Sequence, residues 1–304
     1  MLKTGRRGRD DIDVVSVSIW SAYIKRKLSQ SSLYQIEKVI EPAAFGKNQY
    51  GHVIHRNKWP RYRAGKHTPN QALIDAAELH AKGSANMINS VIWEAIRGRK
   101  ELDWFVSEGI GQLSWEVKKV LYKSNKYQLS SELVLAVGQK ELLRLERLAG
   151  LDALAAQIVL LRVADHKNER ERALAIGKSI YRTFLIMCTA IPYLDFSPVL
   201  MSLFDSYVLP LAHDGSKRVH FESENSFLNK VKGLNDIFLT LEDKDLVRVG
   251  RKNVVRVLSD VLHAKYGFEL MFEFAIPVSI LEGKRVEASE LKVNSPEAYV
   301  NSFL

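Results

Sequence analysis

The chain has 304 residues, of which 46% are hydrophobic and 26% are charged. This balance is typical of a globular protein with one or two cored domains, and it excludes the disordered and fibrous classes. The formal net charge is +9. All of this excess lies in residues 1–70, with 14 Lys and Arg against 5 Asp and Glu, whereas residues 71–304 carry 30 of each. A basic module on a neutral body favours nucleic acid as a partner.

Three elements are predicted before the most basic part of the chain. Residues 1–13 are expected to form a flexible basic arm, because glycines separate the arginines and apolar content is low. Such arms lie along phosphates or in a minor groove. Residues 14–28 have helical apolar spacing and end in three cations, which complement the helix dipole. A second amphipathic helix is predicted over residues 33–40, with an N-cap among the preceding serines and a stop before Pro42.

The basic stretch that follows is the predicted nucleic-acid interface. Cations and flat rings share a short helix, in which Pro60 is tolerated if it lies in the first turn. Gly65 makes a turn, and Pro69 opens another helix that runs to residue 82. Side chains of this kind suit a phosphate backbone. The predicted interface comprises Arg56, Asn57, Lys58, Trp59, Arg61, Tyr62, Arg63, Lys66 and His67. Residues 46–55 are predicted to be a loop with short extended character, which touches DNA through Lys47, Asn48 and Gln49.

The segment YRAGKHTP, residues 62–69, followed by Leu73 and Ala76-Ala77, resembles the end of the recognition helix in Cro/Xre-type helix-turn-helix domains. In that family an aromatic residue closes the recognition helix, a glycine makes the turn, and a proline starts the next helix. The resemblance covers residues 54–79. It implies a helix-turn-helix domain over residues 14–83, in which two helices support the recognition helix.

Some side chains of the predicted interface are expected to contact base edges, and others to contact phosphates. Those expected nearest to base edges are Asn57, Lys58 and Arg61, since arginine suits guanine and asparagine suits adenine. Those expected to position the backbone without reading sequence are Arg56, Arg63, Lys66 and the arginines of the arm. Two alternatives stay open for Trp59 and Tyr62, which either contact bases or anchor a small core. For Tyr62 the resemblance favours the anchor.

From residue 84 onward the sequence predicts a larger helical domain, residues 84–304, for oligomerisation or partner binding. Residues 129–163 are predicted to form two helices divided at Gly150. Residues 268–281 alternate and indicate a short terminal strand or hairpin with Pro277 at an edge. The predicted fold is mainly α, with a small N-terminal helix-turn-helix domain and a larger helical domain that ends in a short β element.

The sequence supports no enzyme class, catalytic residue, metal or cofactor. Cys188 is the only cysteine, so an internal disulfide and cysteine-rich zinc sites are excluded, and its apolar surroundings predict a buried thiol. His213-Asp214 and His220-Phe221-Glu222 could serve a metal or acid/base site, but they lack the spacing of such sites and ordinary loop histidines are favoured. Hydrolase and nucleotide-binding motifs are absent. A helical enzyme without short motifs stays an alternative.

These features together predict a DNA-binding protein of the bacterial transcription-regulator type, acting as a homodimer or as a subunit of a larger complex. The alternative is a non-enzymatic nucleic-acid-binding subunit of a multi-protein or ribonucleoprotein assembly of the host-defence type, which grips structured RNA or DNA. The sequence shows no signal peptide and its longest apolar run is too short to span a bilayer, so no membrane partner and a cytoplasmic location are expected.

Overall fold

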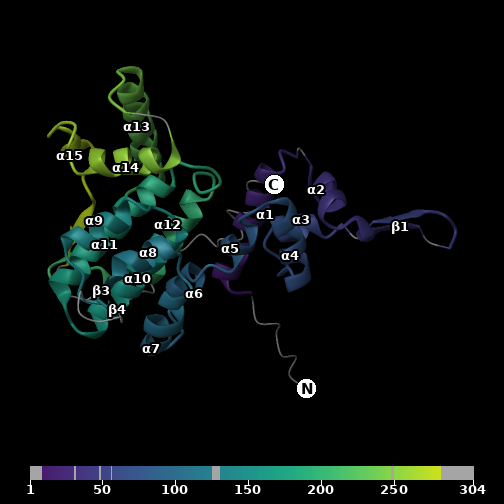
Figure 1. The fold of residues 1–304 in the computed structure, drawn as a ribbon, viewed down its shortest axis with the longest axis horizontal. Coiled ribbons are helices and arrows are strands. Elements are labelled where there is room, and N and C mark those ends of the chain that lie inside the picture. The colour runs from purple at the N-terminus through teal and green to yellow at the C-terminus, as the bar shows by residue number, and fades with distance from the viewer. Residues whose placement is uncertain are drawn as a thin grey trace. The chain divides into compact units, whose positions relative to one another are not determined.

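The computed structural model of the chain describes residues 9–30, 32–47, 49–55, 57–124, 131–247 and 250–281. Most of them are helical, so the predicted mainly-α fold is confirmed (Figure 1). The chain divides into two compact units, and the boundary between them lies between Trp93 and Glu94. Among the described helices, none has the length and apolar character needed to cross a membrane.

Within its described residues, unit 1 is an assembly of helices with one β-hairpin. Its elements are α1 (Asp11–Lys27), α2 (Leu33–Ile40), β1 (Phe45–Lys47), β2 (Val53–His55), α3 (Trp59–Arg63), α4 (Gln71–His80) and α5 (Ser84–Ile88). The carboxylate of Asp10 accepts a hydrogen bond from the backbone N–H of Ile12 and caps α1. Helix α1 therefore begins inside the segment predicted as a flexible arm, of which residues 1–8 lie outside the described residues. A capping box between Ser32 and Gln35 starts α2 where it was predicted.

Helix α1 is the centre of unit 1, and it contacts α2, α3 and α5. Trp20 of α1 stacks on Trp59 of α3, with ring centroids 5.6 Å apart, and both side chains are fully buried. Tyr62 meets Trp20 and Trp59 edge-on at 6.0 and 5.9 Å. Buried aromatic contacts of this geometry contribute beyond the area they remove from water. The three rings therefore fix α3 against α1.

Helix α5 belongs to unit 1, although the sequence predicted a domain boundary near residues 82–84. The Glu78 carboxylate near the end of α4 accepts hydrogen bonds from the backbone N–H groups of Gly83 and Ala85, both at 2.8 Å. Burial would raise the pKa of Glu78, but these bonds outweigh it and lower that pKa. They tie the start of α5 to α4, and α5 also contacts α1. For this reason the boundary falls after α5.

The residues described in unit 2 form helices and two short antiparallel strand pairs. Its elements are α6 (Ile92–Arg97), which crosses the boundary, α7 (Leu102–Trp104), α8 (Trp115–Leu121), β3 (Tyr122–Ser124), β4 (Ser131–Leu133), α9 (Gln139–Glu146), α10 (Leu151–His166), α11 (Arg170–Met187), α12 (Ser197–Tyr207), β5 (Lys217–Val219), α13 (Glu224–Asp243), α14 (Arg251–Leu262), α15 (Leu270–Glu273) and β6 (Val278–Ile280). Helices α10 and α11 pack together at its centre, and α9, α13 and α14 contact α11 (Figure 1). Cys188 lies buried just after α11, as predicted, and burial raises the pKa of its thiol.

Two predicted elements of unit 2 differ from the fold. The helix expected to begin at residue 129 begins instead at Gln139, because β4 pairs with β3 before it. Residues 125–130 lie outside the described residues. The predicted terminal strand forms only as β6, which pairs with β5 in the register Val219↔Val278 and Lys217↔Ile280. Before it, residues 270–273 of the alternating segment form α15 instead of a strand.

Candidate nucleic-acid interface

Helix α3 has five residues, and one face of it is part of the core of unit 1. Pro60 lies in its first turn, where a backbone N–H would have no acceptor within the helix, so the lack of an N–H in proline costs no hydrogen bond. Trp59 is 0% exposed and Tyr62 is 7% exposed. Burial raises the pKa of Tyr62, and nearby Glu41 and Glu37 add to that shift. These two members of the predicted interface are therefore core anchors, which was one of the two alternatives left open for them and the favoured one for Tyr62.

The turn after α3 packs closely against α1. Gly65 adopts a left-handed conformation with φ of +62°, and a Cβ built there would lie 2.5 Å from the carbonyl oxygen of Val14. The Arg9 guanidinium donates to the carbonyl oxygen of Gly65 and, at 2.6 Å, to Oγ1 of Thr68. Burial lowers the pKa of Arg9, and Asp13 counteracts part of the shift. Arg9 thus ties the N-terminal end of α1 to the turn, instead of lying in a free arm.

The exposed basic side chains of the predicted interface gather at the end of α3. We define the basic turn as Arg61, Lys66 and His67, whose side chains are exposed. The Arg61 Nη1 atom lies 3.3 Å from Nε2 of His67, and the backbone N–H of Lys66 donates to the carbonyl oxygen of Arg61 at 2.8 Å. These contacts hold the three residues of the basic turn together.

The remaining members of the predicted interface have different surroundings. Asn57 is exposed in a left-handed conformation, with φ of +47°. The Nζ atom of Lys58 lies 3.5 Å from a carboxylate oxygen of Glu41, and the Lys58 side chain is 36% exposed. Arg63 is half-buried, and Arg56 lies outside the described residues. Asn57 and Lys58 therefore lie just before α3, with the basic turn at its other end.

The predicted loop before α3 is a β-hairpin, which Figure 1 shows extending from the helices of unit 1. Strands β1 and β2 pair antiparallel in the register Phe45↔His55 and Lys47↔Val53. At the base, His55 stacks on Phe45 with centroids 4.7 Å apart, and Tyr34 of α2 meets both rings edge-on at 5.2 Å. Only the extended character of this loop was predicted. The signal for pairing was two short β-type segments around a Gly-containing loop.

A second feature missed in the sequence is the distribution of acidic residues. Residues 42–74 contain no Asp or Glu, but they contain six Lys or Arg and three His. This acid-free stretch includes the whole hairpin, α3 and the basic turn. The nearest carboxylates before it belong to Glu37 and Glu41, which face His55 and Lys58. A continuous part of unit 1 therefore presents cations without neighbouring anions of its own segment.

The connection between α2 and α3 differs from that of the predicted helix-turn-helix. A turn of three or four residues joins the two helices of that motif. Here residues 41–58, including the hairpin, separate α2 from α3. The two helices still contact each other and α1. The local resemblance therefore coincides with α3, its glycine turn and α4, but the connection before α3 is a hairpin.

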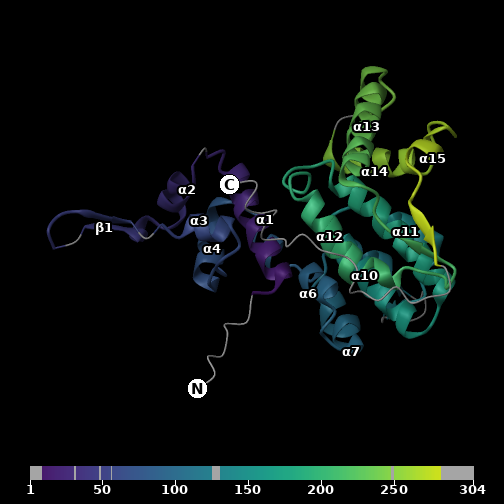
Figure 2. The same ribbon diagram turned by 180° about the vertical axis from the view of Figure 1, so that it is seen from behind.

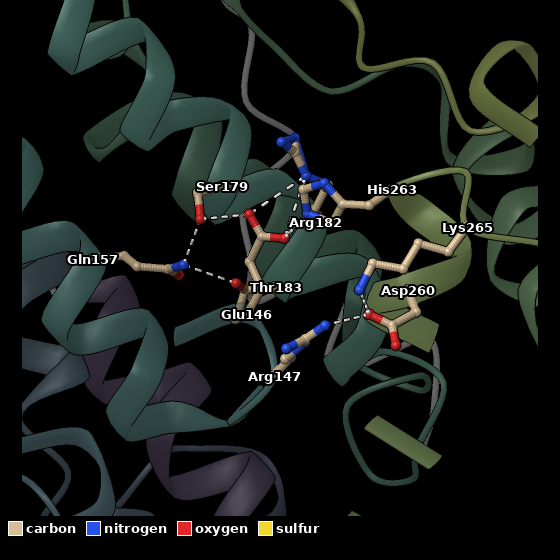
Figure 3. A network of polar contacts seen from close by, with 9 residues as sticks. All are labelled: Glu146, Arg147, Gln157, Ser179, Arg182, Thr183, Asp260, His263 and Lys265. Carbon is tan, nitrogen blue, oxygen red and sulfur yellow. Dashed lines mark hydrogen bonds and ion pairs between the residues drawn. The ribbon is translucent and has the colours of Figure 1, made fainter. Parts of the chain in front are cut away.

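Unit 2 holds a buried polar network, drawn in Figure 3. The carboxylate of Glu146, at the end of α9, accepts from Oγ of Ser179 at 2.7 Å and lies 2.6 Å from Nε2 of His263. The Nε atom of Arg182 lies 3.4 Å from the same carboxylate. Gln157 donates to Ser179 from the other side at 2.9 Å. The network satisfies a carboxylate that is 1% exposed and joins α9, α10, α11 and the segment after α14.

The two histidine-containing motifs of unit 2, at His213 and at His220, make contacts within their own loops and with α11. Nε2 of His213 lies 3.0 Å from Nη1 of Arg170, and the Asp214 carboxylate accepts from the backbone N–H groups of the turn that follows it. Nδ1 of His220 lies 2.9 Å from the carbonyl oxygen of Phe221. In the part of the chain that the structure describes, no three His, Cys, Asp or Glu side chains form a group that could hold a metal ion.

Comparison of the chain with protein-family models, curated proteins and solved structures finds no match.

Proposed function

We propose that the chain is a duplex DNA-binding protein of the transcription-regulator type, and that unit 1 binds the DNA. The observation that carries the proposal is the acid-free stretch, residues 42–74, which places the exposed basic turn, Lys58 and the hairpin on one segment. Binding to a duplex depends mainly on neutralising phosphates, and the exposed side chains of Arg61 and Lys66, on a segment that contains no carboxylates, suit that role.

The side-chain geometry supports a division between phosphate contacts and core anchors. Arg61 and Lys66 are exposed on the basic turn, whereas the aromatic rings of α3 face α1. Proteins that bind single strands without sequence preference stack bases on exposed aromatic rings. The rings of α3 are buried, so α3 and the basic turn are better suited to phosphates of a duplex than to unstacked bases. Asn57, exposed just before α3, carries an amide of the kind that pairs with adenine at a base edge.

The test is duplex binding by a variant that lacks three of these cations. Lys58→Ala, Arg61→Ala and Lys66→Ala are combined, and fluorescence anisotropy measures affinity for a labelled duplex at several salt concentrations. Each lost phosphate contact should reduce the slope of log affinity against log salt by about 0.9. The slope of the triple variant should therefore be smaller by about 2.7 if each side chain contacts one phosphate.

The matched control removes the same charge from unit 2. Lys167, Lys232 and Lys244 are exposed there, and their combined replacement by alanine should leave affinity and salt slope unchanged. A flat salt response of the unchanged protein, or equal losses in both triple variants, would contradict the proposal. Nucleic acid that copurifies with the native protein should be duplex DNA. A discrete structured RNA would favour a subunit of a ribonucleoprotein assembly instead.

A further inference from the structure

The tip of the β1–β2 hairpin is an exposed part of unit 1. Tyr50 is 75% exposed, and Gln49 beside it is also exposed. A Cβ built on Gly46 or Gly51 would meet no atom within 4 Å. The hairpin therefore reaches beyond the helices of unit 1 as a two-stranded ribbon, which both views of the fold show (Figures 1 and 2).

The base of the hairpin is fixed to α2 by a buried polar contact. Nε2 of His55 lies 2.8 Å from Oε2 of Glu37, whose side chain is 1% exposed. Phe45 and Tyr34 pack on the same imidazole. A buried carboxylate is costly without a partner, so this contact favours one position of the hairpin base. The ribbon thus projects from unit 1 in a direction set by α2.

The charge of the hairpin suits the same partner as the basic turn. The ribbon lies wholly within residues 42–74, which lack Asp and Glu. A two-stranded ribbon fits the major groove of B-form DNA, whereas α3 has only five residues and buries one face. The amide of Gln49 has the donor and acceptor that pair with adenine in that groove, and the ring of Tyr50 can contact a thymine methyl group.

From these observations we propose that the β1–β2 hairpin enters the major groove of duplex DNA and supplies sequence discrimination through Gln49 and Tyr50, while the basic turn holds phosphates. This inference rests on the proposed function, because it names the part of unit 1 that reads the duplex. It assigns sequence reading to a ribbon, whereas a helix-turn-helix would assign it to a recognition helix.

The test compares the native chain with a Gln49→Ala/Tyr50→Ala variant. Duplexes bound by the native chain are selected from a pool with a randomised centre, and affinities are then measured for the selected duplex and a scrambled one. The variant should lose discrimination by about tenfold or more, the size of a good base-edge contact. Its affinity for the scrambled duplex and its salt slope should be unchanged, because phosphate contacts are retained.

The matched control is Gln71→Ala/Leu79→Ala, which removes an exposed amide and an exposed large side chain from α4 of the same unit. It should keep full discrimination, and circular dichroism should show native helicity in both variants. Methylation of the selected duplex identifies the groove. Methyl groups on guanine N7, in the major groove, should block binding, and methyl groups on adenine N3, in the minor groove, should not.

The outcomes separate the inference from the function on which it rests. Native discrimination in the Gln49→Ala/Tyr50→Ala variant, or interference at adenine N3 alone, would overturn the hairpin inference and leave duplex binding by unit 1 intact. Salt-dependent binding of the native chain without any preferred sequence would do the same. Absence of duplex binding by the native chain, or preference for RNA or single strands, would overturn both.

Discussion

Replacement of Gly65 by alanine should destabilise unit 1 through two effects that can be worked out separately. The backbone there has φ of +62°, and an L-residue in this conformation costs about 1–2 kcal/mol. The new Cβ would also lie 2.5 Å from the carbonyl oxygen of Val14 and 2.6 Å from its Cγ1. Atoms cannot approach that closely, so α1 or the turn must move, at a cost typical of overpacking of about 1–3 kcal/mol. The expected loss in free energy of unfolding is about 2–5 kcal/mol.

A second glycine separates the two effects. Gly51 also has positive φ, +80°, but a Cβ there would meet nothing within 4 Å. Gly51→Ala should therefore lower the free energy of unfolding only by the cost of the left-handed backbone, about 1–2 kcal/mol, or by less if the loop relaxes. A chain with two units need not unfold in one step, so hydrogen exchange of the slowest amides of α1 is the suitable measurement. Equal protection in the two variants would refute close packing of the turn against α1.

Two further predictions concern unit 2. Burial raises the pKa of Asp205 from 3.8 to about 6, so this group contributes stability below pH 4 that is lost as pH rises through about 6. Asp205→Asn should remove at most about 3 kcal/mol of pH dependence across that window in urea unfolding, and parallel pH profiles of the two proteins would contradict this. Glu146→Ala should lower the free energy of unfolding of unit 2 by about 3–5 kcal/mol, because it leaves the Arg182 charge without its buried partner. Arg256→Ala is the control, since its side chain is 68% exposed and 4.0 Å from Asp260, and a loss above about 1 kcal/mol would be unexpected.

Helices α1, α2 and α4 were predictable because their signals are local. Apolar periodicity located all three, and the serines before α2 indicated its N-cap, which is Ser32. The start of α1 was placed too late because the acidic residues of its first turn were interpreted as part of an arm. These residues instead lie at the positive end of the helix dipole, with Asp10 as the N-cap.

The orientation of the Trp59 ring was not predictable from the segment that contains it. An aromatic residue among cations has the same local pattern whether it faces solvent or a core. Trp59 is buried because Trp20, on a helix far away in the sequence, stacks on it. The hairpin was missed for a related reason. Whether two short strands pair depends on the partner across the loop, and the sequence of each three-residue strand alone gives only a weak signal. Arg9 likewise turned inward because Gly65 and Thr68 supply acceptors that only the fold brings near.

The arrangement of α3 links the stability of unit 1 to the position of its cations. Arg61 and Tyr62 are neighbours in a five-residue helix, so the ring that is buried against Trp20 fixes the direction in which the guanidinium leaves the surface. The Gly65 turn then places Lys66 and His67 beside that guanidinium. In a helix of five residues, a displacement of the buried ring also displaces the neighbouring cations. The proposed contacts with phosphates would therefore depend on the aromatic core of unit 1 as directly as on the charges themselves, because that core determines where the charges are held.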